Sequence, residues 1–409
     1  MLRAMTRISF LAVLLGSLPL ALWGQQARFA MPHPDKPILG QALTQEPQND
    51  ATSPADSGTY ITFDAPGAAK GTFAVAINSQ SAIVGYYNDA NFVAHGFVRS
   101  SGGTITVINV PGAGTYAVAI NSAGVITGNY YDVNFGNHGF VRAINGNVTS
   151  FDVPGAYFYS TAGAIDPEGN VTGTYYDTNF VTHGFLRSAD GTVMSIDPAG
   201  SEGTQAFGIT AQGAVIGCYA DASMVGHGFI RASNGAMTTF DLPNSATYYP
   251  GCSSDYGYFV GNVALVGNNP AGQMTGAYFE PISGNPFGGN YRGFLRADDG
   301  SYTTFDAVSS PSSPCCTWTF GVAINPAGVT VGFDNDYSNV NHAFIRATDG
   351  TVTILDAPGA GTGVNEGTWA FSVNQATVVV GQYMDANRMM HSFLRCPGWG
   401  NAHGCGAGQ

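Results

Sequence analysis

The stretch from Pro111 to Asp152, PGAGTYAVAINSAGVITGNYYDVNFGNHGFVRAINGNVTSFD, decides the fold. It holds four strand-like runs, which are separated by turn residues such as Ser122-Ala123-Gly124 and Asn145-Gly146-Asn147. The runs are Tyr116 to Asn121, Val125 to Asp132, His138 to Ala143, and Val148 to Asp152. Four short antiparallel strands in a repeat of about 40–50 residues are typical of one propeller blade.

The H-G-F-x-R pattern of the third run recurs along the chain. It is intact at His95, His138, His183 and His227, and variants of it begin at Arg292, His342 and His391. These seven copies predict an all-β fold, a seven-bladed β-propeller with four antiparallel strands per blade. A solenoid is the competing architecture, but β-helix repeats are shorter and leucine-rich repeats carry a different pattern.

The two ends of the repeat region complement each other. The last copy stops soon after Arg395 without a T-x-F-D strand, whereas an extra strand of this type, Thr59 to Asp64, precedes the first copy. We therefore expect Tyr60 to Phe63 to pair with His391 to Arg395 as the outermost strand of the last blade. The ring would then be closed by an N-terminal outer strand, which removes an exposed sheet edge.

The chain is expected to comprise four segments: a signal peptide (1–24), a flexible leader (25–58), the seven-bladed β-propeller (59–396) and a C-terminal tail (397–409). Arg3 and Arg7 flank the start of an apolar run from Ile8 to Leu22, an order typical of a secretory signal. A membrane anchor is the alternative, but the run is too short to span a bilayer comfortably. We expect a secreted or periplasmic protein.

Charged residues are few and mostly acidic. Asp and Glu number 27 against 14 Lys and Arg, so the formal net charge is −13. Nucleic acids and anionic lipid surfaces select basic patches, and this balance therefore disfavours both as partners. The expected partner is a glycan or a protein, bound by a monomer that has no membrane span after signal removal.

All six cysteines lie after the signal segment, and an even number in an exported chain favours disulfides. Their spacing lacks the C-x-x-C pairs of a zinc site. Cys396 and Cys405 could close a small loop at the C-terminus, and Cys252 could bridge to Cys315 or Cys316. The spacing alone leaves the connectivity open.

Six of the eight histidines occupy one position of the repeat, and an aspartate stands six residues before each of them. The histidines are His95, His138, His183, His227, His342 and His391, and the aspartates are Asp89, Asp132, Asp177, Asp221, Asp336 and Asp385. Acidic residues also end most outer strands, at Asp64, Asp152, Asp197, Asp241, Asp306 and Asp356, with Asn109 in that place once.

These residues have two interpretations. One is a ring of metal or catalytic sites. We favour the other, in which each histidine donates to a nearby aspartate and ties two strands of its own blade together. A site needed once is not normally built six times, and buried polar groups require partners in any case. The repeated arginine that follows, for example Arg142, is expected to make a similar structural pair.

No cofactor and no catalytic residue are predicted. The D-x-N segments, such as Asp132-Val133-Asn134, faintly resemble calcium loops. Calcium binding is therefore the alternative to turns that hold no metal ion. They lack the full D-x-[DN]-x-[DN]-G pattern and its distal glutamate. Asx turns, in which the side chain accepts hydrogen bonds from its own backbone, account for them better.

The long insertions predict where a ligand binds. If the strands of each blade are labelled A to D from the channel outward, the D-to-A and B-to-C loops share one face. Every large departure from the repeat falls there: 244–262, Glu280 to Tyr291, Ser309 to Trp318, and Gly361 to Trp369. Loops on a rigid scaffold commonly bind ligands, and exposed aromatic rings suit sugars or protein surfaces. The candidate ligand-binding residues are Tyr248, Tyr249, Asp255, Tyr256, Glu280, Trp318, Glu366 and Trp369. Neutral drift of surface loops is the alternative.

The recurring A-x-A-I-N, G-x-Y-x-D and H-[GA]-F-x-R segments resemble the HAF-repeat family of bacterial extracellular proteins, from Thr59 to Arg395. The His-Ala-Phe of the family name occurs unchanged at His342-Ala343-Phe344. The resemblance implies an extracellular repeat protein and no established reaction. The sequence thus favours an extracellular binding or scaffolding module with a glycan or protein ligand on the long-loop face of blades five to seven. The alternative is a propeller-type polysaccharide hydrolase or lyase that uses loop carboxylates.

Overall fold

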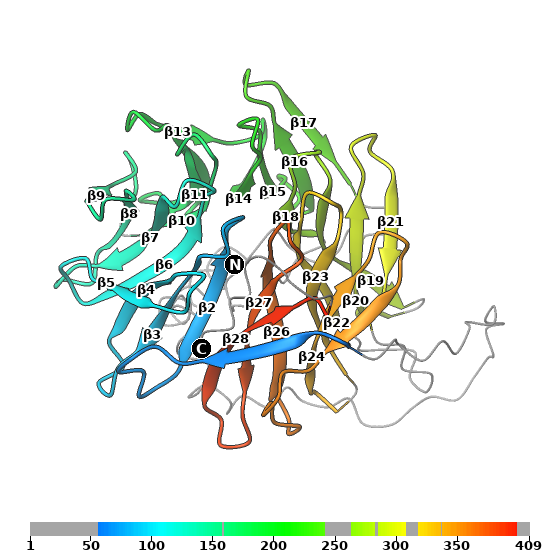
Figure 1. Ribbon diagram of the computed structural model, residues 1–409. Coiled ribbons are helices and arrows are strands. Elements are labelled where there is room, and N and C mark those ends of the chain that lie inside the picture. The colour runs from blue at the N-terminus through cyan, green and yellow to red at the C-terminus, as the bar shows by residue number, and fades with distance from the viewer. Residues whose placement is uncertain are drawn as a thin grey trace.

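The computed structural model describes residues 56–157, 159–241, 263–282, 285–307, 318–336 and 338–398. In these ranges the regular elements are all β-strands, β1 to β28, as the repeat predicts (Figure 1). Across the same residues there is no helix of the length and hydropathy needed to cross a membrane.

Sixteen strands form four separate sheets, each with four antiparallel strands in chain order. We call these sheets units one to four. Unit one comprises β2 (Thr72–Ile77), β3 (Ile83–Asn88), β4 (Ala94–Arg99) and β5 (Ile105–Ile108). Unit two comprises β6 (Gly114–Ile120), β7 (Ile126–Tyr131), β8 (Asn137–Arg142) and β9 (Val148–Phe151). Unit three comprises β10 (Ser160–Ile165), β11 (Val171–Tyr176), β12 (Thr182–Arg187) and β13 (Val193–Ile196). Unit four comprises β14 (Gly203–Ile209), β15 (Val215–Ala220), β16 (Gly226–Arg231) and β17 (Met237–Phe240).

The other twelve strands belong to one larger sheet, which contains three more antiparallel groups of four. Unit five comprises β18 (Val263–Asn268), β19 (Met274–Ile282), β20 (Asn285–Arg296) and β21 (Tyr302–Phe305). Unit six comprises β22 (Trp318–Ile324), β23 (Thr330–Asn335), β24 (Asn341–Arg346) and β25 (Val352–Leu355). Unit seven comprises β26 (Gly367–Val373), β27 (Val379–Met384), β28 (Met390–Cys396) and β1 (Thr59–Phe63). Single parallel residue pairs join these groups, Tyr291 with Trp318 and Asn341 with Gly367.

The strands of unit two lie within two residues of the predicted runs, because local sequence defines them. Gly124 and Gly146 have positive φ angles of 83° and 92°, which glycine adopts without steric cost, and they end the two tight turns. Gly128 is needed for close packing: a Cβ there would lie 2.0 Å from the Tyr116 carbonyl oxygen and 2.9 Å from the Phe140 ring. Phe140 has no exposed surface, and equivalent phenylalanines fill the other units.

Residues from the two ends of the described chain meet in unit seven. β1 pairs antiparallel with β28 from Thr59 opposite Cys396 to Phe63 opposite Ser392, which is the pairing that the surplus N-terminal strand predicts. Figure 1 shows blue β1 lying beside red β28. The Asp56 carboxylate also accepts a hydrogen bond of 3.0 Å from Nε of Arg395.

A recurring contact links the turns between the first two strands of neighbouring units. The side-chain amide of Asn78 donates to the Asn121 carbonyl at 3.1 Å, and that of Asn325 donates to the Asn374 carbonyl at 3.1 Å. Asn374 in turn donates to the carbonyl of Asn78 at 3.3 Å, so the same link joins unit seven to unit one. Each asparagine also accepts hydrogen bonds from its own turn, for example from Val125 to Asn121 at 2.9 Å.

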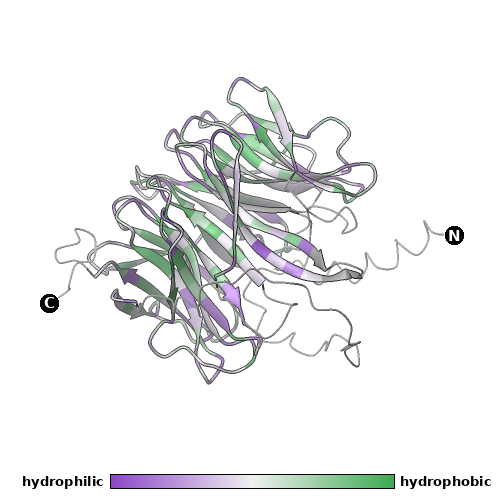
Figure 2. Ribbon diagram, turned by 90° about the vertical axis from the view of Figure 1, so that its right-hand side faces the viewer, coloured by the Kyte–Doolittle hydropathy of each residue, from purple (hydrophilic) through white to green (hydrophobic). Residues whose placement is uncertain are grey.

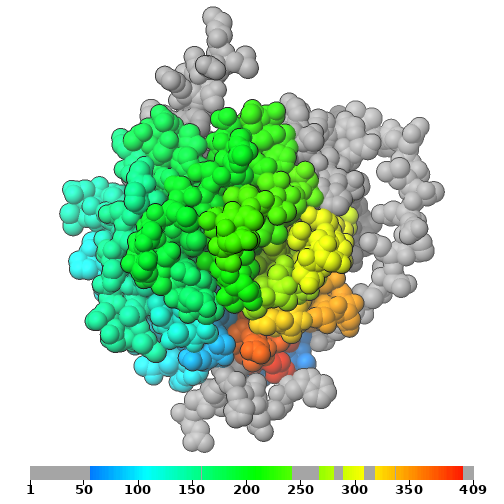
Figure 3. Space-filling model, turned by 90° about the horizontal axis from the view of Figure 1, so that it is seen from above, coloured from blue at the N-terminus to red at the C-terminus, as the bar shows by residue number. Residues whose placement is uncertain are grey.

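The units follow one another in chain order around the molecule. Seen from above, the surface passes from cyan through green to yellow and orange (Figure 3). Hydrophobic residues concentrate along the strands, and hydrophilic ones predominate in many of the connecting turns (Figure 2). The turns and loops at the strand ends are therefore where polar chemistry is displayed.

One predicted loop proves to be part of the sheet. Glu280 to Tyr291 was expected to be an enlarged B-to-C loop, but β19 and β20 extend through most of it, and Glu280 pairs with Asn290. Pairing satisfies backbone groups that a long loop would leave to solvent. Unit five therefore carries a long two-stranded projection in place of a loop.

Candidate functional site

The repeated histidines each bridge two polar side chains of their own unit. In unit two, Nδ1 of His138 lies 2.6 Å from Asp152, and Nε2 lies 3.4 Å from Asp132. The imidazole also stacks on Tyr130 with ring centroids 5.0 Å apart. The other oxygen of Asp132 accepts hydrogen bonds from the backbone of Asn134 and Gly136, both at 2.8 Å. Each group is thus already engaged, which favours the structural interpretation.

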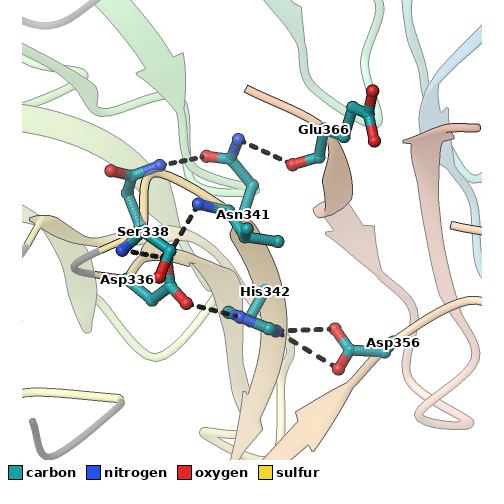
Figure 4. A network of polar contacts seen from close by, with 8 residues as sticks. Asp336, Ser338, Asn341, His342, Asp356 and Glu366 are labelled. Atoms are coloured by element: carbon teal, nitrogen blue, oxygen red, sulfur yellow. Dashed lines mark hydrogen bonds and ion pairs between the residues drawn. The ribbon is translucent and has the colours of Figure 1, made fainter. Parts of the chain in front are cut away.

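The same geometry recurs in units one, three, four, six and seven. The Nδ1 contacts are His95 with Asn109, His183 with Asp197, His227 with Asp241, His342 with Asp356, and His391 with Asp64. The Nε2 contacts are with Asp89, Asp177, Asp221, Asp336 and Asp385 at 3.4–3.7 Å. Figure 4 shows His342 between Asp336 and Asp356. The contact between His391 and Asp64 connects β28 to the residue that follows β1, so this histidine also holds the N-terminal strand in unit seven.

Neighbouring carboxylates raise the pKa of two of these imidazoles, those of His138 and His342. Burial by itself lowers the pKa of His138, but hydrogen bonds to Asp152 and Asp132 outweigh it and raise the pKa. At His342 the hydrogen bond to Asp356 is the largest influence and also raises the pKa. Hydrogen bonds from the turn backbone lower the pKa of Asp132. The imidazoles of His138 and His342 therefore hold their proton more firmly than free histidine does, which does not favour these two as metal ligands.

We expect His138→Ala to lower the free energy of unfolding by roughly 1–3 kcal/mol, because Asp152 and Asp132 would lose their shared partner. Urea unfolding measures the change. Ile144→Ala in the same unit is the control, since that side chain is 75% exposed and should leave stability almost unchanged. Unaltered stability of His138→Ala, together with loss of ligand binding, would show that the histidine is functional.

Unit five replaces the histidine with Arg292. Its Nε and Nη2 contact Asp306 at 3.1 and 3.0 Å, and its Nη1 contacts Glu280 at 3.1 Å. The arrangement of one cationic group between two acids is kept, but the cation is now permanent. Glu280, a predicted ligand residue, is thus an ion-pair partner within the sheet.

Unit six differs from the other units at the residue that pairs with its histidine. Asp334 stands on β23 opposite His342, where the paired residue is tyrosine in units one to five and unit seven. The side chain is completely buried and accepts a hydrogen bond from the Thr319 hydroxyl, while Oδ2 has no hydrogen-bond partner. Burial raises the pKa of Asp334 to about 7. The sequence shows that Asp334 departs from the G-x-Y-x-D pattern, but it does not show that the carboxyl group is buried.

Glu366 and Trp369, two predicted ligand residues, are buried in the fold. The Glu366 carboxylate accepts a hydrogen bond from the backbone of Gly363 at 2.8 Å. Its backbone carbonyl accepts one of 3.1 Å from the side-chain amide of Asn341 (Figure 4). Trp369 is only 8% exposed and belongs to β26. It does not offer an exposed ring of the kind that the loop prediction required, and we leave it out of the proposed surface.

Trp318 is the predicted aromatic that remains partly exposed among the described residues. It begins β22 and meets the ring of Tyr291 edge-on, with centroids 5.8 Å apart. Tyr291 also stacks on Phe320 at 5.5 Å, and Phe320 stacks on Phe333 at 5.2 Å. The seam between units five and six is therefore lined by aromatic rings. Tyr248, Tyr249, Asp255 and Tyr256 lie outside the described residues.

The described residues bear on only part of the cysteine and metal predictions. Cys218 and Cys396 are buried, and each is disulfide-bonded. Cys252, Cys315, Cys316 and Cys405 lie outside the described residues, so the connectivity stays a prediction. Within the described ranges no three His, Cys, Asp or Glu side chains are grouped to hold a metal ion.

No family model and no curated protein matches this chain. Among solved structures it is similar to a streptogramin B lyase, with a TM-score of 0.52 and 12% identity over 83% of this chain and 99% of that one. It is also similar to virginiamycin B lyase from Staphylococcus aureus, with a TM-score of 0.51 and 11% identity over 82% of this chain and 99% of that one. At such identity the likeness shows the fold alone, which is a β-propeller.

Proposed function

We propose that residues 59–396 form a closed seven-bladed β-propeller whose blades are units one to seven. The pairing of β1 with β28 supports this closure. So does the hydrogen bond from Asn374 to Asn78, because it repeats between the last and first units the link seen between consecutive units. The Ser392 hydroxyl likewise accepts a hydrogen bond of 2.8 Å from the backbone of Ala74, across the same boundary.

On this scaffold the best-supported function is an extracellular binding or scaffolding module. The resemblance to HAF-repeat proteins and the signal-like N-terminal segment support export. The repeated His–Asp clusters support a structural role for the most abundant titratable groups. The proposed ligand is a glycan or a protein, and the proposed site is the long-loop face of units five to seven.

One observation carries this site assignment. The polar chemistry of the repeat is altered in two adjacent units, where Arg292 replaces histidine and Asp334 replaces tyrosine. Trp318 and Tyr291 lie at the junction between these units. The predicted insertions 244–262 and Ser309 to Trp318 lead into the same two units. Changes in strand residues together with loops in two adjacent units favour a localised binding site over neutral drift of surface loops.

We expect Tyr249→Ala combined with Trp318→Ala to weaken binding at least tenfold on a glycan array, because large aromatic contacts dominate such sites. Trp318→Phe is the matched control: it keeps an aromatic ring against Tyr291 and should retain most of the binding. Circular dichroism establishes that the variants remain folded. Unchanged binding by the double variant would place the ligand elsewhere.

Asp334 favours a second candidate, a polysaccharide hydrolase or lyase. Its pKa of about 7 matches that of a general acid–base group, and its unsatisfied Oδ2 would exchange the proton, provided that the buried side chain is opened to substrate. The discriminating assay measures release of reducing or unsaturated sugar ends from a panel of polysaccharides. Turnover by the wild type that Asp334→Asn abolishes would support the enzyme, whereas binding without turnover supports the module.

A further inference from the structure

The B-to-C loops of six units contain a residue in the left-handed conformation. The residues are Phe92, Phe135, Phe180, Met224, Asn339 and Arg388, with φ angles of 59–64°. Among L-residues, asparagine tolerates this conformation well, and Asn339 in unit six is the expected choice. A bulky residue there is an outlier, yet three successive units use phenylalanine and the fourth uses methionine.

Burial does not compensate for this strain. The side chains of Phe92, Phe135 and Phe180 are 54%, 76% and 40% exposed, and Met224 is 49% exposed. An exposed hydrophobic side chain in a strained loop contributes little to the core. Strained, exposed residues of this kind are found at functional sites more often than elsewhere.

Two of these rings contact side chains from neighbouring loops. Lys70, from the loop before β2, lies 5.1 Å from the centroid of Phe92. Tyr157, from the loop before β10, meets Phe180 edge-on with centroids 5.8 Å apart, and it is itself 57% exposed. These contacts place D-to-A and B-to-C loops together on one face, as the strand order requires.

Hydrogen-bonding groups belong to or connect with the turn that carries Phe135. The Asp152 side chain is 72% exposed and reaches Asp132, the first residue of the Phe135 turn, through His138. Asn134, next to Phe135, is exposed. Carboxylates and amides accept hydrogen bonds from hydroxyl groups, and an aromatic face packs against the C–H surface of a sugar ring. The formal net charge of −13 disfavours polyanions.

We propose that Phe92, Phe135, Phe180 and Met224 form a row of contact sites for a neutral polysaccharide, one on each of units one to four. The repeat places equivalent loops on successive units, so a long glycan can contact several of them at once. Multivalent contact of this kind raises the overall affinity well above that of a single site. The proposal rests on the proposed binding role but uses different units from the long-loop site.

The test is a triple variant, Phe92→Asn, Phe135→Asn and Phe180→Asn, which adopts the residue found at Asn339. The assay is native gel electrophoresis through xyloglucan, galactomannan, glucomannan or dextran, with alginate as the polyanion. We expect at least one neutral polymer to retard the wild type and alginate not to do so. The triple variant should lose at least tenfold in affinity while its melting temperature stays level or rises, because strain is relieved.

Ile144→Asn is the matched control, since Ile144 is 75% exposed in the C-to-D turn on the opposite face and should not affect retardation. A marked fall in the melting temperature of the triple variant would overturn the proposal by showing that the rings stabilise the fold. Wild-type mobility unaffected by every neutral polymer would also overturn it. So would self-association that the triple variant abolishes without polysaccharide retardation. Retardation that only the Tyr249 and Trp318 changes remove would leave the proposed function standing and refute this inference.

Discussion

Deletion of the chain through Asp64 is expected to lower the melting temperature by roughly 10 °C or more. The deletion removes β1 and so exposes the edge of β28 along its pairing from Ser392 to Cys396. It also removes Asp56, the ion-pair partner of Arg395, whose side chain is 8% exposed. A buried cation without its partner costs about 3–5 kcal/mol.

The control is a shorter deletion through Ala55, which keeps Asp56 and β1. Thermal unfolding followed by circular dichroism compares the two proteins. The shorter deletion should melt close to a chain that lacks only residues 1–24, and the longer one well below it. Equal melting temperatures would show that β1 is dispensable and would contradict the proposed N-terminal closure.

Raising the pH is expected to destabilise the protein through Asp334. Its carboxyl group has a pKa of about 7 in the folded protein, raised by burial, against 3.8 for the ordinary group. The stabilisation due to this group is fully present below pH 3.8 and is lost as the pH rises through about 7. The difference in pKa corresponds to a loss on the order of 4 kcal/mol across that interval.

Asp334→Asn removes the titration and should flatten the pH dependence of stability between about pH 4 and pH 7. Urea unfolding at a series of pH values measures the difference between the variant and the wild type. Asp349→Asn is the control, because that carboxylate is solvent-exposed and accepts a hydrogen bond from Thr351 in a turn. Parallel curves for Asp334→Asn and the wild type would mean that the buried carboxyl group has an ordinary pKa.

Local patterns determine most strand positions, because hydrophobic alternation and turn residues act over a few positions. β6 to β9 lie within two residues of the predicted runs for this reason. The unmatched strand at the N-terminus was also sufficient to predict its pairing with β28. The histidine contacts were predictable in part: the sequence indicated an aspartate partner, but not that each histidine bridges two side chains.

Tertiary structure alone decides the chemistry of particular sites. Asp334 is an ordinary aspartate in the sequence, and its raised pKa arises because β22, β23 and β24 together exclude water from it. Trp369 follows a glycine-rich segment, yet the strand to which it belongs buries it. The φ angle of Phe135 is set by closure of the turn between β7 and β8, which no propensity of phenylalanine predicts. The sequence by itself thus determined the repeat and its strands, because these depend on neighbouring residues. Burial and exposure were decided by the packing of strands against one another, and the strain at Phe135 was decided by closure of its turn.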